Sequence, residues 1–67
     1  MSYVEFRQLV LSELRRNPAG CSWRELRERL HLPYRQPCPT WTRRMEQEDG
    51  LTRTAGTGRA LIWRIDK

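Results

Sequence analysis

In residues 3–16, hydrophobic residues recur three or four positions apart, which places them on one face of a helix. Ser2 and Glu5 stand three residues apart at the start of this segment, as in a capping box. The segment RRNPAG, positions 15–20, supplies the basic residues that favour a helix C-terminus and then residues that break a helix. We therefore expect a helix that starts at about Tyr3. Its core-facing residues are expected to be Tyr3, Phe6, Leu9, Val10 and Leu14.

A second helical pattern occupies residues 22–32, SWRELRERLHL. Ser22 and Glu25 repeat the capping box, so a helix is expected to open there. Arg and Glu alternate over much of the segment, which is typical of a solvated helix face and by itself indicates no site. Cys21, just before this helix, is expected to form a very short strand. The residues expected to face the core are Trp23, Leu26 and Leu30.

A proline-rich connector, LPYRQPCP at positions 32–39, separates the second helix from a third. Prolines make such a segment stiff and extended. The third helix is expected to open at about Cys38–Pro39, because the residue before a proline avoids the α region and proline suits the first helical turn. Trp41 and Met45 lie four residues apart and are expected to face the core. Gly50 stands where a left-handed residue ends a helix.

Alternation replaces helical spacing after this glycine. LTRT and RALIWRI flank AGTG, positions 55–58, and two such segments around a glycine-rich tip are typical of a β-hairpin. Leu51, directly after the glycine, is expected to reach the core. Alternate residues of a strand point to the same face of a sheet. The second strand is expected to face the core with Leu61, Trp63 and Ile65.

The composition favours a single small domain with an anionic partner. A chain of 67 residues is the size of one domain, so we expect residues 1–67 to fold as a unit. Thirteen Lys and Arg against eight Asp and Glu give a formal net charge of +5, which favours a polyanion, although a GC-rich coding sequence explains the number of arginines equally well. No apolar run approaches the roughly 18 residues of a membrane span, and the start, MSYVEF, has no signal-peptide pattern. We expect a cytoplasmic protein without a membrane partner.

Few residues are candidates for catalysis or metal binding. Cys21, His31 and Cys38 are possible metal ligands, but they lack the paired short spacings of zinc modules. An acid–base catalyst needs a pair of ionisable groups in a concave site. The chain has one His, and no carboxylates are expected to lie together in a pocket. Because AGTG lies between two strands, a tight turn explains its glycines better than a phosphate-binding loop does. We expect neither an enzyme nor a bound metal or cofactor.

Three helices, a Gly-Leu junction and a glycine-rich hairpin resemble the winged helix-turn-helix family of DNA-binding domains over nearly the whole chain. SWRELRERLHL resembles the second helix of that family, and EDGLTRTAGTGRALIWRI resembles its wing. The resemblance implies an α+β fold: a small winged-helix domain with three helices followed by a two- to three-stranded antiparallel β-hairpin wing. It also implies double-stranded DNA binding of a transcriptional regulator type. A recognition helix at about 39–49 would enter the major groove, beside a basic wing at about 53–59.

The side of the third helix opposite Trp41 and Met45 is polar. Its side chains can hydrogen-bond to base edges, and other cationic or hydroxyl groups in the connector and the wing can hold phosphates. The predicted base-contacting residues are Thr40, Arg43 and Gln47. The predicted backbone-contacting residues are Arg35, Arg53, Thr57 and Arg59.

Two departures from the family pattern support an alternative. The connector is long, and one extra residue stands between Met45 and Gly50, where acids that repel phosphate gather. These acids are Glu46, Glu48 and Asp49. In the alternative, the domain is a winged-helix protein–protein interaction module that uses this acidic end and an exposed Tyr34 loop. A continuous positive strip through the four predicted arginines would favour DNA, and interruption by acids would favour a protein. A monomer is expected, with a homodimer through the first helix as the less favoured state.

Overall fold

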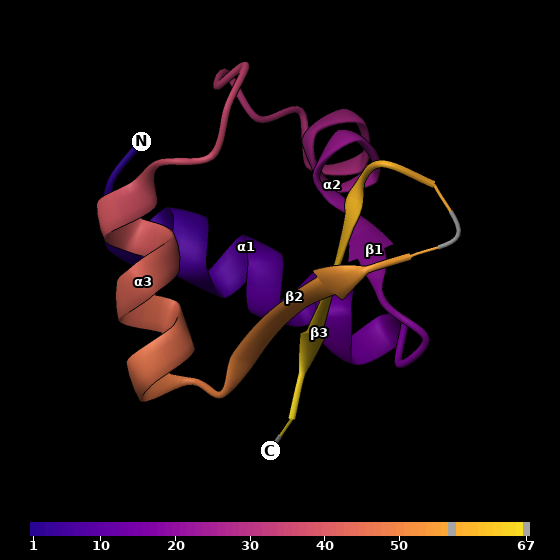
Figure 1. Ribbon diagram of the computed structural model, residues 1–67. Helices are drawn as coiled ribbons and strands as arrows, with labels where there is room; N and C mark the ends of the chain where they lie inside the picture. Colours follow the sequence, from indigo (N-terminus) through magenta and orange to yellow (C-terminus); the bar gives the residue numbers. More distant parts are fainter. Residues whose placement is uncertain (57, 67) are drawn as a thin grey trace.

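The computed structural model describes residues 1–56 and 58–66. In these residues β3 pairs antiparallel with both other strands, which gives the sheet order β1-β3-β2. The α+β class is confirmed, with three helices and a three-stranded antiparallel sheet in the part of the chain that the structure describes. The elements follow one another as α1 (Tyr3–Arg16), β1 (Cys21–Ser22), α2 (Trp23–Leu30), α3 (Pro39–Glu48), β2 (Leu51–Ala55) and β3 (Leu61–Ile65) (Figure 1).

Helices α1 and α2 begin where their capping residues predict. The Ser2 hydroxyl accepts a hydrogen bond from the backbone N–H of Glu5 at 3.2 Å. At α2 the bonds are reciprocal: Ser22 accepts from the Glu25 N–H, and the Glu25 carboxylate accepts from the Ser22 N–H at 3.0 Å. That second bond lowers the pKa of Glu25. Helix α2 stops at Leu30, before the end of the predicted segment, because His31 turns into the left-handed region at φ 52°.

Helix α3 opens without a side-chain cap. Pro39 occupies its first turn as predicted, after an extended Cys38. The buried Thr42 hydroxyl donates to the carbonyls of Cys38 and Pro39, at 3.1 and 3.0 Å. These bonds tie the side chain of Thr42 to the start of its own helix. Gly50 follows the helix with φ 70°, which confirms the left-handed residue expected there.

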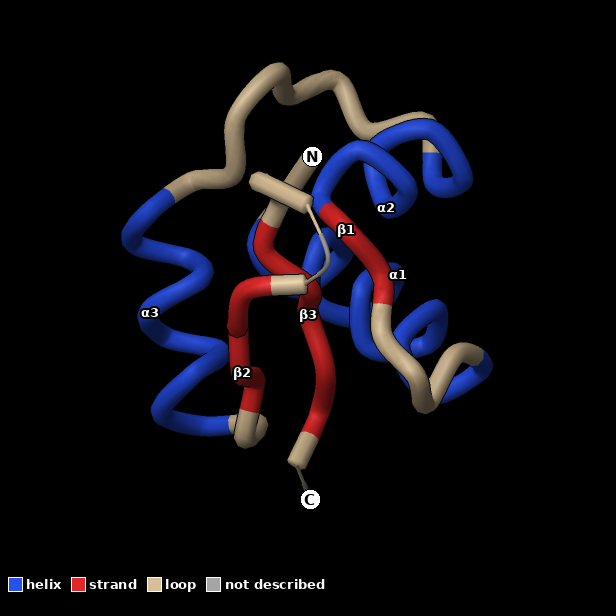
Figure 2. The backbone as a smooth tube through the Cα atoms, turned by 45° about the vertical axis from the view of Figure 1, so that its right-hand side comes forward, coloured by secondary structure: helices blue, strands red, loops and turns tan. Residues whose placement is uncertain are grey.

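The core lies where the helices meet the sheet. Figure 2 shows the three strands between α3 on one side and α1 and α2 on the other. Helix α3 contacts β2, whereas α1 and α2 contact β3. Trp41 and Tyr34 pack beside Phe6, with ring centroids 5.1 and 6.2 Å from it, which joins α3 and the connector to α1. The buried core residues are Phe6, Val10, Leu11, Leu14, Cys21, Leu26, Leu32, Met45, Leu51 and Trp63.

Three side-chain predictions are wrong. Leu9 was expected in the core but is 37% exposed, because it lies on the outer side of α1 and Leu11 takes the buried position. Leu61 is 45% exposed, since it lies next to the hairpin tip and borders an open hollow. Tyr34 was expected to be exposed but is half-buried, because its ring packs edge-on against Phe6. Of the helices in the described residues, none is long and apolar enough to cross a membrane.

Candidate nucleic-acid interface

The three predicted base-contacting residues lie together on the outer face of α3. Thr40, Arg43 and Gln47 are all exposed, and at about 100° per residue their side chains leave the helix in similar directions. None of the three forms a hydrogen bond or ion pair with another described residue. The opposite face carries the buried residues Thr42 and Met45. The outer face therefore presents hydroxyl, guanidinium and amide groups to solvent.

Each acid at the end of α3 is held by an arginine. Asp49 is only 8% exposed and binds the guanidinium of Arg7 on α1, whose Nε donates to Oδ2 at 2.9 Å. This hydrogen bond raises the pKa of Arg7. Glu48 accepts from Nε of Arg44 at 3.1 Å. Because their charges are matched within the domain, these acids repel a nearby phosphate less than their number in the sequence suggests.

Arg53 connects the hairpin to α3. Its Nη2 donates to Oε1 of Glu46 at 3.0 Å, and its guanidinium carbon lies 5.5 Å from the centroid of the Trp63 ring. Its Nε is buried and forms no hydrogen bond with the residues that the structure describes. The register places Arg53 directly opposite Trp63 on β3. Arg53, which was predicted to contact a backbone phosphate, thus already binds a carboxylate.

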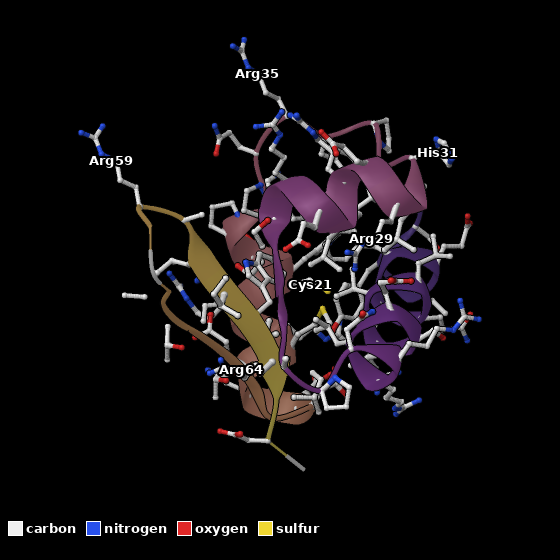
Figure 3. All side chains as sticks on the ribbon, turned by 90° about the vertical axis from the view of Figure 1, so that its right-hand side faces the viewer. Cys21, Arg29, His31, Arg35, Arg59 and Arg64 are labelled. Carbon is white, nitrogen blue, oxygen red and sulfur yellow. The ribbon has the colours of Figure 1, made fainter. Side chains whose placement is uncertain are left out.

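Arg35 and Arg59 project from the same end of the molecule. Figure 3 shows both side chains pointing away from the core, one from the connector and one from the hairpin. Both are exposed, and neither forms an ion pair with a described residue. The connector is fixed here, because the Trp23 indole donates to the Arg35 carbonyl at 3.0 Å. The remaining predicted backbone contact, Thr57, lies outside the described residues.

A hollow of about 400 Å³ lies between α3, the connector and β2. It is bordered by Arg43, Arg53 and Glu46, and also by Gln36 from the connector. Glu46 therefore interrupts the predicted positive strip at the hollow that Arg43 and Arg53 border. Asp49 does not interrupt it, because that residue borders a different hollow near α1 and Ile65.

Sequence reasoning missed two features of this surface. Gln36 carries no periodic or motif signal, and only the folded connector brings it beside Arg53. Arg7 lies 42 positions before Asp49, so no local spacing indicates their pairing. In contrast, Arg44 and Glu48 stand four apart, a spacing that does indicate an ion pair on a helix.

The candidate metal ligands do not gather. Cys21 is buried, and Figure 3 shows His31 at the outer end of α2, pointing away from it. Burial raises the pKa of the Cys21 thiol. The described residues contain no group of three His, Cys, Asp or Glu side chains arranged to hold a metal ion. Both Cys21 and Cys38 are free thiols.

Searches against protein-family models, curated proteins and solved structures find no match to the chain. Function is therefore inferred from the residues of the interface. On α3 the interface exposes the planar side chains of Arg43 and Gln47, which donate hydrogen bonds, and the hydroxyl of Thr40. Planar donors of this kind match guanine and adenine edges in the major groove of DNA.

Proposed function

We propose that this domain binds double-stranded DNA, with α3 in the major groove and the β2–β3 hairpin against the sugar–phosphate backbone. The observation that carries the proposal is the outer face of α3. Thr40, Arg43 and Gln47 are exposed there without partners among the described residues, while the acids of the same helix are bound to arginines. A helix that matches its acids internally and leaves its donors exposed is suited to an anionic partner.

The arrangement of the elements supports a winged-helix reading of the fold. Helix α3 is followed directly by the β2–β3 hairpin and contacts β2, so the helix and the hairpin lie side by side. In this reading α3 is the recognition helix and the hairpin is the wing. A wing beside a recognition helix reaches the backbone or the minor groove next to the major groove that the helix occupies.

The proposed roles follow from side-chain chemistry. Arg43 donates two hydrogen bonds to guanine, and Gln47 pairs with adenine, with Thr40 as a further base contact. Arg35 and Arg59 bind backbone phosphates, which fixes the position of the helix without reading sequence. The proposal takes the domain as a monomeric regulator of transcription in the cytoplasm, where its two free thiols stay reduced.

The protein-interaction alternative has less support than its sequence basis suggested. It relied on an exposed Tyr34 loop and on the acidic end of α3. Tyr34 packs against Phe6, and Asp49 is almost buried against Arg7. Binding of a protein in place of DNA is therefore an outcome of the test and not a second proposal.

The test is a titration of a fluorescent random-sequence duplex at low salt, followed by selection of a preferred site. The wild-type domain is expected to bind, and Arg43→Ala to bind the selected site roughly five- to 150-fold more weakly, since one bidentate base contact is lost. The matched control is Arg16→Ala, which removes an equal charge from the end of α1. It should change affinity little. Failure of the wild-type domain to bind any duplex at low salt would contradict the proposal.

A further inference from the structure

The hollow between α3 and β2 is bordered by donors from three elements. Arg43 comes from α3, Arg53 from β2, and Gln36 from the connector. The space of about 400 Å³ is large enough for a phosphate group with water. It is also accessible, because the side chains of Arg53 and Glu46 at its border are 28% and 40% exposed. A ligand that enters it lies between the proposed recognition helix and the proposed wing.

Among the described residues that border this hollow, Glu46 carries the only carboxylate. Its Oε1 accepts from Nη2 of Arg53 at 3.0 Å, the same charge-assisted contact that a phosphate oxygen makes with a guanidinium. The guanidinium is not saturated, because the Nε of Arg53 is buried without a hydrogen-bond partner in the described residues. A partly exposed pair with one short contact is a weak interaction. A phosphate of equal charge can therefore displace the carboxylate.

We infer that this hollow binds one backbone phosphate of DNA, with Arg53 as its cationic ligand and Gln36 as a neutral donor, and that Glu46 is an internal competitor for that phosphate. The inference rests on the proposed DNA binding and adds to it a site and a residue that limits affinity. Arg43, on the same hollow, keeps its base contact. Glu46 then holds Arg53 in place in the free domain and weakens binding to every duplex by the same factor.

The test compares two substitutions that remove equal charge from the same helix. Glu46→Gln keeps the size of the side chain and one oxygen that can accept from Arg53, but it removes the negative charge that competes with a phosphate. Glu48→Gln is the matched control, since Glu48 is also ion-paired, with Arg44 at 3.1 Å, but does not border the hollow. Binding of a random-sequence duplex is measured by fluorescence anisotropy at several salt concentrations for the wild type, both variants and Glu46→Gln/Arg53→Gln.

Glu46→Gln is expected to bind about tenfold more tightly at roughly 50 mM salt, with a slope of log affinity against log salt that is steeper by about 0.9, because one more phosphate is neutralised. Glu48→Gln should change affinity by no more than about twofold, since it releases Arg44, which does not border the hollow, and otherwise alters only screened long-range charge. The double variant should lose the gain. Thermal unfolding checks that each variant is folded. If the double variant does not fold, the comparison of the two single variants still tests the inference.

Three results would overturn the inference while leaving DNA binding intact. Equal gains for Glu46→Gln and Glu48→Gln would mean that net charge alone acts. Weaker binding by Glu46→Gln would mean that Glu46 has a structural role and positions the hairpin for binding. A gain that persists in the double variant would exclude Arg53 as the ligand. If the wild type and Glu46→Gln both fail to bind DNA at low salt, the proposed function fails, and this inference fails with it.

Discussion

The two faces of α3 differ in how completely their polar groups are used. On the inner face, Met45 is fully buried, and the hydroxyl of Thr42 donates to the carbonyls at the start of the helix. On the outer face, Arg43 and Gln47 are exposed and have no partner among the described residues. The inner face therefore holds the helix in the domain, and the outer face is available for a ligand.

Ion pairs on the flanks of α3 explain why the two faces stay separate. Arg44 binds Glu48 and also lies 4.5 Å from the centroid of the Tyr3 ring on α1, and Arg53 binds Glu46 from β2. Glu46 is thus paired with a residue of a neighbouring strand, and Glu48 with a residue of its own helix. The outer face is left with donors whose charge is positive or zero. Stability and binding should therefore respond to different substitutions on one short helix.

The largest expected effect is on stability, from the inner face. Met45→Ala removes a fully buried side chain and should lower the free energy of unfolding by about 2–5 kcal/mol. Denaturant unfolding followed by circular dichroism measures it. Gln47→Ala on the outer face is the control, and it should change stability by no more than about 0.5 kcal/mol. Equal losses for the two variants would show that the faces are not separate.

The next effect is on DNA binding, from the outer face. Arg43→Ala should cost about 1–3 kcal/mol on the preferred site and relax discrimination at one base position. Arg59→Ala should instead weaken binding to all duplexes by a similar factor and lower the salt slope by about one unit, as one lost phosphate contact does. Competition titrations with specific and random duplexes measure both. Equal, sequence-independent losses would mean that α3 does not read bases.

A smaller effect isolates one hydrogen-bonding group of the inner face. Thr42→Val keeps the shape of the side chain but removes the hydroxyl that donates to Cys38 and Pro39, so it should cost about 1 kcal/mol of stability. Thr40→Val makes the same chemical change on the outer face, where the hydroxyl has no such bond. Thermal unfolding of the two variants gives the comparison. A larger loss for Thr40→Val would reverse the assignment of the faces.

The smallest effect is the pH dependence of α2. The backbone N–H of Ser22 lowers the pKa of Glu25 in the folded state, so its contribution to stability is fully present above the unfolded pKa. That contribution is lost as the pH falls through the lower folded pKa. Glu25→Gln should therefore lose less stability than the wild type between neutral and acidic pH. Urea unfolding across this pH range tests it, and an unchanged pH profile would contradict the role of Glu25.

The parts of the fold that could be predicted depend on short-range signals. Ser22 and Glu25 cap α2 within one turn, and Pro39 and Gly50 mark the ends of α3 by backbone conformation alone. These signals need no knowledge of the rest of the molecule. Leu61 was misplaced because alternation identifies one face of a strand but not how far the helices cover it.

The candidate site was predictable only in part for the same reason. The exposure of Arg43 follows from helical spacing relative to Met45. The pairing of Glu46 with Arg53 does not, because it requires the hairpin to pack beside α3. Likewise, Asp49 reads as a free acid in the sequence and is almost buried against Arg7 in the structure. Long-range ion pairs decide which charges of this chain are matched inside the domain.

The salt dependence of duplex binding tests the central claim most directly. Affinity for a random-sequence duplex is measured at low and at moderate salt, and each phosphate contact should contribute about −0.9 to the slope of log affinity against log salt. With contacts from Arg35, Arg59 and their neighbours, affinity should fall by an order of magnitude or more across this range. Binding that does not change with salt, or no binding to any duplex at low salt, would contradict the claim.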